Sequence, residues 1–197
     1  SFSGVLSATL MVNFHTNVWA ACAIAILATT VLGMINGLIA VGLGVAPIII
    51  TLGTMTAFKG MAYLICGGIS VYGTPDALRM IGQGYVAGVI PIPVIILVIV
   101  VIIVAFILNK TTFGRSVFAL GGNDEAARLA GINVKAIRGL LYAISGFGAG
   151  LAGVIMCSRL SSGVPNSGTG YEFDTVTACV IGGVSANGGE GKVSGVL

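Results

Sequence analysis

Charged side chains are scarce in this chain of 197 residues, because only 8% of them are Asp, Glu, Lys or Arg. Soluble domains carry about 25% charged residues. The chain is 56% hydrophobic, and its mean hydropathy is +1.08. This composition excludes an ordinary soluble domain and predicts an integral membrane protein in contact with lipid. The net charge of +3 is too small to indicate a nucleic-acid partner.

Two further absences argue against particular classes of function. Asp and Glu do not occur inside the long apolar runs, whereas proton- and sodium-coupled carriers depend on intramembrane carboxylates. The chain also lacks the Gly-x-x-x-x-Gly-Lys-Ser/Thr loop that cradles phosphates. The glycine run ending at Lys192 imitates the end of that loop, but Val193 stands where the hydroxyl is needed. We therefore expect a protein that is not an enzyme and does not hydrolyse ATP by itself.

Histidine and cysteine are too sparse for a metal site. The single histidine, His15, lies in a polar break with no second ligand near it in the sequence. The cysteines lack the short spacings of metal sites. We expect all four to be reduced packing residues in or beside apolar runs: Cys22, Cys66, Cys157 and Cys179.

Several apolar runs are long enough to cross about 30 Å of hydrocarbon as helices. We predict an all-α polytopic transmembrane bundle with spans at 18–41, 46–66, 91–108 and 139–158. Residues 175–197 are apolar but interrupted by a glycine-rich turn, which predicts a broken helix. Since the chain lacks an initiator Met and ends in an apolar run, we expect a fragment, truncated at both ends, of a single transmembrane domain.

Glycines recur at small-x-x-x-small spacing in two of the predicted spans. Gly33 and Gly37 form one such pair, and Gly146 and Gly150 form another. Small residues let helix backbones approach closely in membranes. Both pairs therefore predict helix-packing faces.

The longest polar segment, residues 109–138, separates two predicted spans. Cytoplasmic loops of membrane proteins are enriched in Lys and Arg. The segment is therefore expected to be cytoplasmic, because its basic residues outnumber those of the flanking loops: Lys110, Arg115, Arg128, Lys135 and Arg138.

A short capped helix is predicted in the middle of this loop. Asn123 is a suitable N-cap, and Asp124 and Glu125 follow in the first turn, where the helix dipole favours carboxylates. Gly131 is suited to the position just after the helix. Spacing alone leaves two interpretations open, a solvated connector or a docking element for a partner.

Three runs of residues resemble sugar-type ABC importer permeases, the ribose/xylose/galactose-like members of the branched-chain permease superfamily. Thr112–Val134 resembles their cytoplasmic loop. Gly168–Asp174, together with Val180–Ser185 and the following glycines, resembles a second motif of the family. Thr51–Met55, followed by Lys59, resembles a third and weaker motif.

The resemblance implies a multi-pass permease subunit in the inner or plasma membrane. It would pair with a second permease copy, a cytoplasmic ABC ATPase that binds the ATP, and an extracytoplasmic sugar-binding protein. It implies no cofactor of the chain's own. By the same resemblance, the short helix is the coupling helix that enters a cleft of the ATPase. Its residues are Asn123, Asp124, Glu125, Ala126, Ala127, Arg128, Leu129 and Gly131.

The resemblance also suggests import of a ribose-like monosaccharide. Three alternatives stay open: branched-chain amino acids, another small solute, or a secondary transporter. A neutral sugar is recognised by hydroxyls, amides and aromatic faces, although the same groups also serve in helix packing. The candidate pathway residues are Asn36, Thr51, Thr54, Phe58, Ser185 and Asn187.

Overall fold

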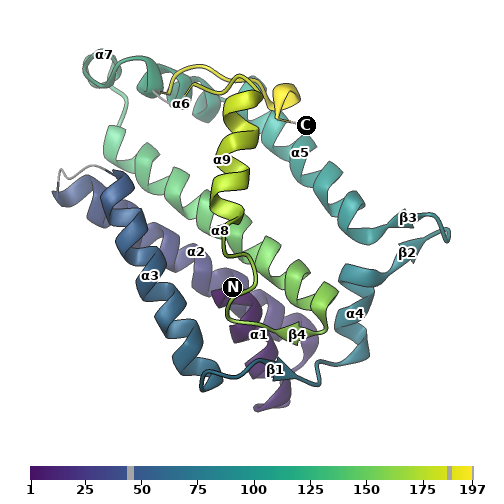
Figure 1. Ribbon diagram of the computed structural model, residues 1–197. Helices are drawn as coiled ribbons and strands as arrows, with labels where there is room; N and C mark the ends of the chain where they lie inside the picture. The colour runs from purple at the N-terminus through teal and green to yellow at the C-terminus, as the bar shows by residue number, and fades with distance from the viewer. Residues whose placement is uncertain (44–46, 186–187, 197) are drawn as a thin grey trace. The chain divides into compact units, whose positions relative to one another are not determined.

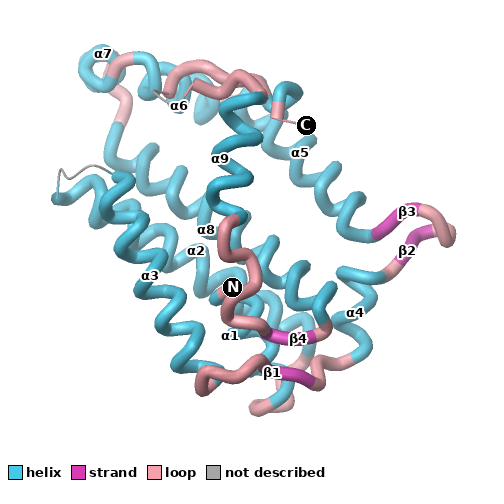
Figure 2. The backbone as a smooth tube through the Cα atoms, in the orientation of Figure 1, coloured by secondary structure: helices cyan, strands magenta, loops and turns pink. Residues whose placement is uncertain are grey.

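The computed structural model describes residues 1–43, 47–185 and 188–196 (Figure 1). Most of these residues are helical, and the described strands form antiparallel pairs of two-residue strands (Figure 2). The chain divides into two compact units, Ser1–Ile95 with Gly139–Gly168, and Ile96–Arg138 with Thr169–Leu197. The predicted helical architecture is confirmed. That the two units form one transmembrane domain stays a prediction.

Among the described residues, four helices are long and apolar enough to cross a membrane. The shortest has 19 residues, which gives about 29 Å at 1.5 Å per residue, close to the thickness of the hydrocarbon core. All four lie where the apolar runs predict spans. They are α2 (Val18–Leu43), α3 (Pro47–Cys66), α5 (Ile92–Lys110) and α8 (Val134–Leu160).

Helix α8 begins five residues before the predicted span at 139. Asn133 caps it, because its side-chain oxygen accepts a hydrogen bond from the backbone N–H of Ala136 at 3.1 Å. Lys135 and Arg138 were expected to lie in the loop because they are charged. They lie instead in the first turns of the helix. A charged first turn does not end a helix, so α8 begins before the apolar run that predicts the span.

The core of the first unit is built around α1 (Phe2–Val12), which packs on α2 and α3. The strand pair β1 (Val71–Tyr72) and β4 (Ser162–Gly163) also lies against α1. Small side chains dominate this core and let the helices approach closely. Its buried residues are Ala8, Met11, Ala21, Cys22, Ala25, Leu78, Val154 and Cys157.

Helices α2 and α8 contact each other through the predicted glycine faces. A Cβ atom placed on Gly146 would lie 3.1 Å from the Cα of Gly33, and one placed on Gly37 would lie 2.8 Å from the Cβ of Tyr142. A Cβ on Gly150 would lie 3.1 Å from the Cα of Ile26. Both predicted packing faces are therefore confirmed, and each is the other's partner.

The segment between α3 and α5 contains a helix that the sequence interpretation missed. Helix α4 (Asp76–Gln83) follows Pro75 at its N-cap and buries Leu78 and Gly82 against the end of α8. The Ser158 hydroxyl donates to the Leu78 carbonyl at 2.5 Å. Isolated helices of this length are marginal in water, so the docking on α8 stabilises α4. The hairpin of β2 (Tyr85–Val86) and β3 (Ile90–Pro91) then leads into α5.

The second unit contains α6 (Thr112–Gly122), α7 (Asp124–Leu129), α9 (Tyr171–Ile181) and the 3₁₀ helix η1 (Val193–Gly195). Helix α6 is capped by Thr111, whose hydroxyl oxygen accepts from the Gly114 N–H at 3.2 Å, so much of the predicted loop is helical. Helix α9 starts four residues before the predicted 175. There, the Glu172 carboxylate accepts from the Gly170 N–H at 3.0 Å and favours an earlier first turn.

The predicted interruption after residue 181 is present in the second unit. Helix α9 ends at Ile181, and the described residues regain helical structure only in η1. Gly183, Gly188 and Gly189 adopt φ between 79° and 90°, which L side chains rarely adopt. Glycine therefore permits the irregular backbone that separates the two helical pieces.

Candidate functional site

The short helix α7 lies at the corner between α6 and α8, with the caps that its sequence predicts. The Asn123 side-chain oxygen accepts from the Ala126 N–H at 2.9 Å. Gly131 has φ +81°. The N–H groups of Gly131 and Ile132 donate to the carbonyls of Arg128 and Ala127, both at 3.0 Å, which is the Schellman arrangement. Both ends of α7 are thus defined by local chemistry.

One side of α7 is held by its own chain. Ala127 is buried in a small apolar cluster with Leu120 of α6 and Val134 of α8, and Ile132 and Ile137 pack against that cluster. Burial of this kind contributes about 25 cal/mol per Å² of apolar surface. It joins the three helices at the corner into one packed group.

Asp124 forms an ion pair with Arg138 at the start of α8. Both side chains are almost half exposed, so solvent screens the pair and its contribution is at most about 1 kcal/mol. The pair orients α7 against α8 more than it stabilises the fold. Asp124, which the sequence offers as a docking residue, is therefore engaged by its own chain. Arg138 was not among the predicted site residues.

The other side of α7 is open to solvent. Glu125, Arg128 and Leu129 are exposed and share one face, at i, i+3 and i+4. We call these three residues the docking face. Leu129 is 90% exposed. No other large apolar side chain among the described residues is more exposed. The docking face thus presents one apolar side chain between a carboxylate and a guanidinium on a short helix.

Replacing Asn123 by alanine will loosen α7 without unfolding the protein. Loss of an N-cap costs about 1 kcal/mol, so hydrogen exchange of the α7 amides should become about fivefold faster. Mass-spectrometric hydrogen exchange on the detergent-solubilised protein measures this. The control is Asn109→Ala, which removes a side-chain bond to Ala105 in α5 instead. Equal exchange in both variants would contradict the capping role.

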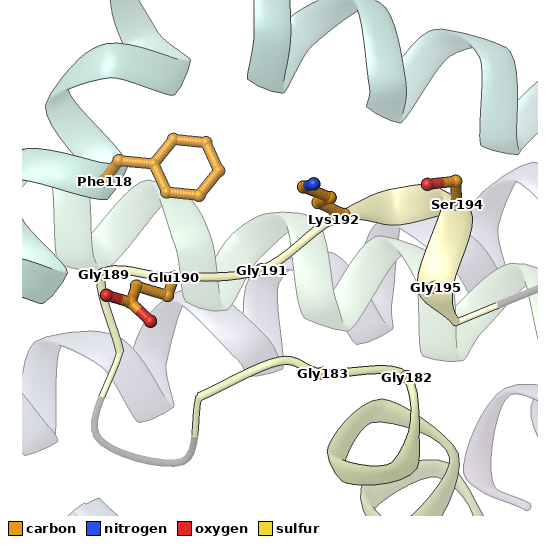
Figure 3. Close-up of a pocket in the computed structure, with 9 residues that line it drawn as sticks. All are labelled: Phe118, Gly182, Gly183, Gly189, Glu190, Gly191, Lys192, Ser194 and Gly195. Atoms are coloured by element: carbon orange, nitrogen blue, oxygen red, sulfur yellow. The ribbon is translucent and has the colours of Figure 1, made fainter.

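A cavity of about 530 Å³ lies in the second unit beside α6 (Figure 3). The Phe118 ring projects from α6 toward the C-terminal segment that carries Lys192 and Ser194. The remaining lining is mostly backbone, because glycines supply it: Gly182, Gly183, Gly189, Gly191 and Gly195, together with Glu190. None of the side chains that line this cavity was predicted; only its glycine-rich walls were visible in the sequence.

The structure distributes the candidate pathway residues over both units. Thr51, Thr54 and Phe58 share the half-buried face of α3. The two hydroxyls donate to carbonyls of their own helix at 2.9–3.1 Å. Ser185 lies between the cavity-lining residues Gly183 and Gly189, and its backbone carbonyl accepts from the Gly188 N–H at 3.1 Å. Asn187 lies outside the described residues.

Asn36, on α2, is half-buried. Its side-chain oxygen is buried and finds no hydrogen-bond partner among the described residues. A buried acceptor without a donor costs about 1–3 kcal/mol. Asn36 is therefore the candidate whose polar atom is still available for another molecule or another segment.

Within residues 1–43, 47–185 and 188–196, no group of three or more His, Cys, Asp or Glu side chains gathers. All four cysteines are free, and Cys22 and Cys157 are buried, as expected of packing residues.

The whole chain, residues 1–197, matches the family model described as "Branched-chain amino acid transport system / permease component". It is 39% identical to the ribose import permease protein RbsC of Haemophilus influenzae, over 100% of this chain and 62% of that protein. The RbsC protein of Bacillus subtilis is 41% identical over 82% of this chain and 51% of that protein.

A further relative is the L-arabinose transport system permease protein AraH of Escherichia coli. It is 38% identical over 99% of this chain and 59% of that protein. The chain thus spans between 51% and 62% of the length of these three relatives. No solved structure matches the chain. The match over residues 1–197, together with the apolar helices, shows that the chain belongs to the family of branched-chain amino acid transport system permease components.

Proposed function

We propose that this chain is part of the membrane-spanning permease subunit of an ATP-driven importer for a monosaccharide such as ribose or arabinose. The observation that carries the proposal is the capped helix α7 with its exposed Leu129, in a chain whose relatives are named as ribose and arabinose permeases. The partners would be a cytoplasmic ABC ATPase, an extracytoplasmic sugar-binding protein and a second permease copy. The location would be the inner or plasma membrane.

In this proposal the loop of residues 109–138 is cytoplasmic, and α7 is the coupling helix. The docking face would enter a cleft of the ATPase, with Leu129 as the apolar anchor and with Glu125 and Arg128 forming charge pairs at the rim. The remaining members of the set, Asn123, Asp124, Ala126, Ala127 and Gly131, would shape and hold the helix rather than contact the partner. The Schellman end at Gly131 ends α7 before α8 begins.

ATP binding would draw the two ATPase subunits together and move α7 with them. The movement would reach the span because α7 is tied to α8 by the Asp124–Arg138 pair and by the cluster of Leu120, Ala127 and Val134. Helix α8 continues without a break to Leu160. The expected change is a hinge or shear motion between inward- and outward-open states. Without a Walker A loop, this chain would supply no ATP hydrolysis itself.

The polar groups proposed for the sugar pathway differ in how many of their hydrogen bonds are already made within the chain. Asn36 is the strongest candidate, since its buried side-chain oxygen accepts from no described residue. The Thr51 and Thr54 hydroxyls already donate to their own helix, although each can still accept. Phe58 offers an apolar face on the same side of α3. Ser185, and by the sequence Asn187, would belong to the turn after α9.

Uptake by the reconstituted complex tests the proposal. The full-length permease, its ATPase and its binding protein are placed in proteoliposomes, and entry of radiolabelled ribose and arabinose is measured. We expect uptake that requires internal ATP and survives collapse of the proton and sodium gradients. Uptake that depends on an ion gradient and does not require ATP would instead support a secondary transporter.

Branched-chain amino acids are a second candidate substrate class, because the family model carries that description. A zwitterionic amino acid needs groups that compensate both of its charges in a desolvated pathway, and the four candidate spans carry few charged residues. Leucine that competes with labelled ribose, or that is itself imported on ATP, would favour this candidate. Competition by sugars alone would exclude it.

A further inference from the structure

Two glycine pairs from distant parts of the chain touch backbone to backbone inside the second unit. Gly121 and Gly122 end α6, while Gly188 and Gly189 lie in the turn after α9. A Cβ atom on Gly121 would lie 2.7 Å from the Cα of Gly189 and 3.0 Å from the carbonyl carbon of Gly188, with the Gly189 nitrogen nearer still. Figure 1 shows the segment after α9 running beside α6.

The close approach requires glycine on both sides. Gly188 and Gly189 have φ of +90° and +79°, so side chains there would be strained whatever the space. A Cβ on Gly189 would lie 2.8 Å from the backbone nitrogen of Gly122. On the α6 side the requirement is specific to one residue. A Cβ on Gly122 would meet no heavy atom within 4 Å, whereas a Cβ on Gly121 would meet backbone.

The contact between Gly121 and Gly189 connects the packed group of α6, α7 and α8, which we call the docking corner, to the cavity. Toward the docking corner, Leu120 of α6 is buried against Ala127 of α7. Toward the cavity, Gly189 and the next residues, Glu190 and Gly191, line its wall. The turn is closed by a hydrogen bond of 3.0 Å from the Ser185 N–H to the Glu190 carbonyl. A displacement of α6 therefore acts directly on backbone atoms of the cavity wall, with no flexible side chain between them.

We propose that Gly121 is a positioning residue that transmits movement of α7 to the wall of the cavity through its backbone contact with Gly189. This inference rests on the proposed function, in which a partner ATPase moves α7. Backbone atoms in van der Waals contact have little freedom to absorb a shift, because packed interiors are stiff. A methyl group at position 121 would push the turn away and alter the cavity without altering the docking face.

The test compares Gly121→Ala with Gly122→Ala in the reconstituted importer. The two variants add the same methyl group to adjacent residues of the same helix. We expect Gly121→Ala to keep the affinity for the ATPase and its ATP hydrolysis within about twofold, but to lower the sugar imported per ATP hydrolysed about tenfold. Gly122→Ala should match the wild type in all three measurements. Equal sugar-to-ATP ratios in the two variants would overturn the inference.

A probe on the cavity wall covers the case in which Gly121→Ala does not fold. Lys192→Cys, in a background with the four native cysteines replaced, carries an environment-sensitive fluorophore beside the cavity. ATP should change its emission in this complex, in which Gly121 is kept, because movement of α7 reaches this wall. A fluorophore that does not respond in an importer that is transporting overturns the inference. A wild-type complex without ATP-driven uptake overturns the proposed function first, and the inference with it.

Discussion

In the proposed importer, Leu129→Asp is expected to weaken docking of the ATPase about 10- to 100-fold and to lower ATP-driven uptake with it. Burial of a leucine side chain contributes about 1.5–3 kcal/mol, and a tenfold change in affinity corresponds to about 1.4 kcal/mol. The substitution removes the apolar anchor and puts a carboxylate in its place, which must be desolvated without a partner on docking. The leucine is 90% exposed in the free chain. The fold itself therefore loses almost nothing by the change.

Co-purification of the ATPase with the tagged permease measures docking, and sugar uptake into proteoliposomes measures transport. The control is Ala136→Asp, which adds the same charge at an exposed position in the first turn of α8, where the helix dipole favours a carboxylate. It should copurify and transport as the wild type does. If Leu129→Asp keeps the wild-type affinity for the ATPase, the docking face has been assigned to the wrong residues.

Gly146→Ala will destabilise the protein by about 1–3 kcal/mol, the range for side chains forced into a packed interface. The added Cβ would lie 2.5 Å from the Thr29 carbonyl oxygen and 3.1 Å from the Cα of Gly33. These are backbone atoms of α2, so the two helices must separate to admit it. Alanine is the better helix former by about 1 kcal/mol, and the clash has to exceed that gain.

Gly148→Ala is the matched control, since a Cβ there meets no heavy atom within 4 Å. It lies on the same helix, two residues away, and should be neutral or slightly stabilising. Thermal unfolding in detergent, followed by circular dichroism, compares the two variants. An unfolding temperature for Gly146→Ala at or above that of Gly148→Ala would show that α2 and α8 do not pack through these glycines.

The local features of the docking corner were predictable because each depends on a few neighbouring residues. The cap at Asn123 and the positive φ of Gly131 follow from side-chain reach and from the absence of a Cβ. The partner of Asp124 was not predictable in the same way, because Arg138 lies fourteen residues further along. Only the packing of α7 against α8 brings the two charges together.

The helix boundaries were also predictable only in part. Composition placed the spans, but it ended the loop at residue 138, because charged residues were taken to lie outside the helix. Asn133 and Glu172 shifted the starts of α8 and α9 by hydrogen bonds that hydropathy does not contain. Helix α4, with its Leu78 buried against α8, is the larger omission.

The sequence by itself determined that this is a polytopic helical membrane protein, where its long apolar helices lie, and that a capped helix interrupts its polar loop. These properties depend on hydrophobicity and on interactions within a few residues. The tertiary structure alone decided that Gly33 meets Gly146, that Gly121 meets Gly189, and that Phe118 lines a cavity with Lys192. A glycine shows in the sequence only that a close approach is permitted. Which backbone makes that approach depends on contacts between residues far apart in the chain.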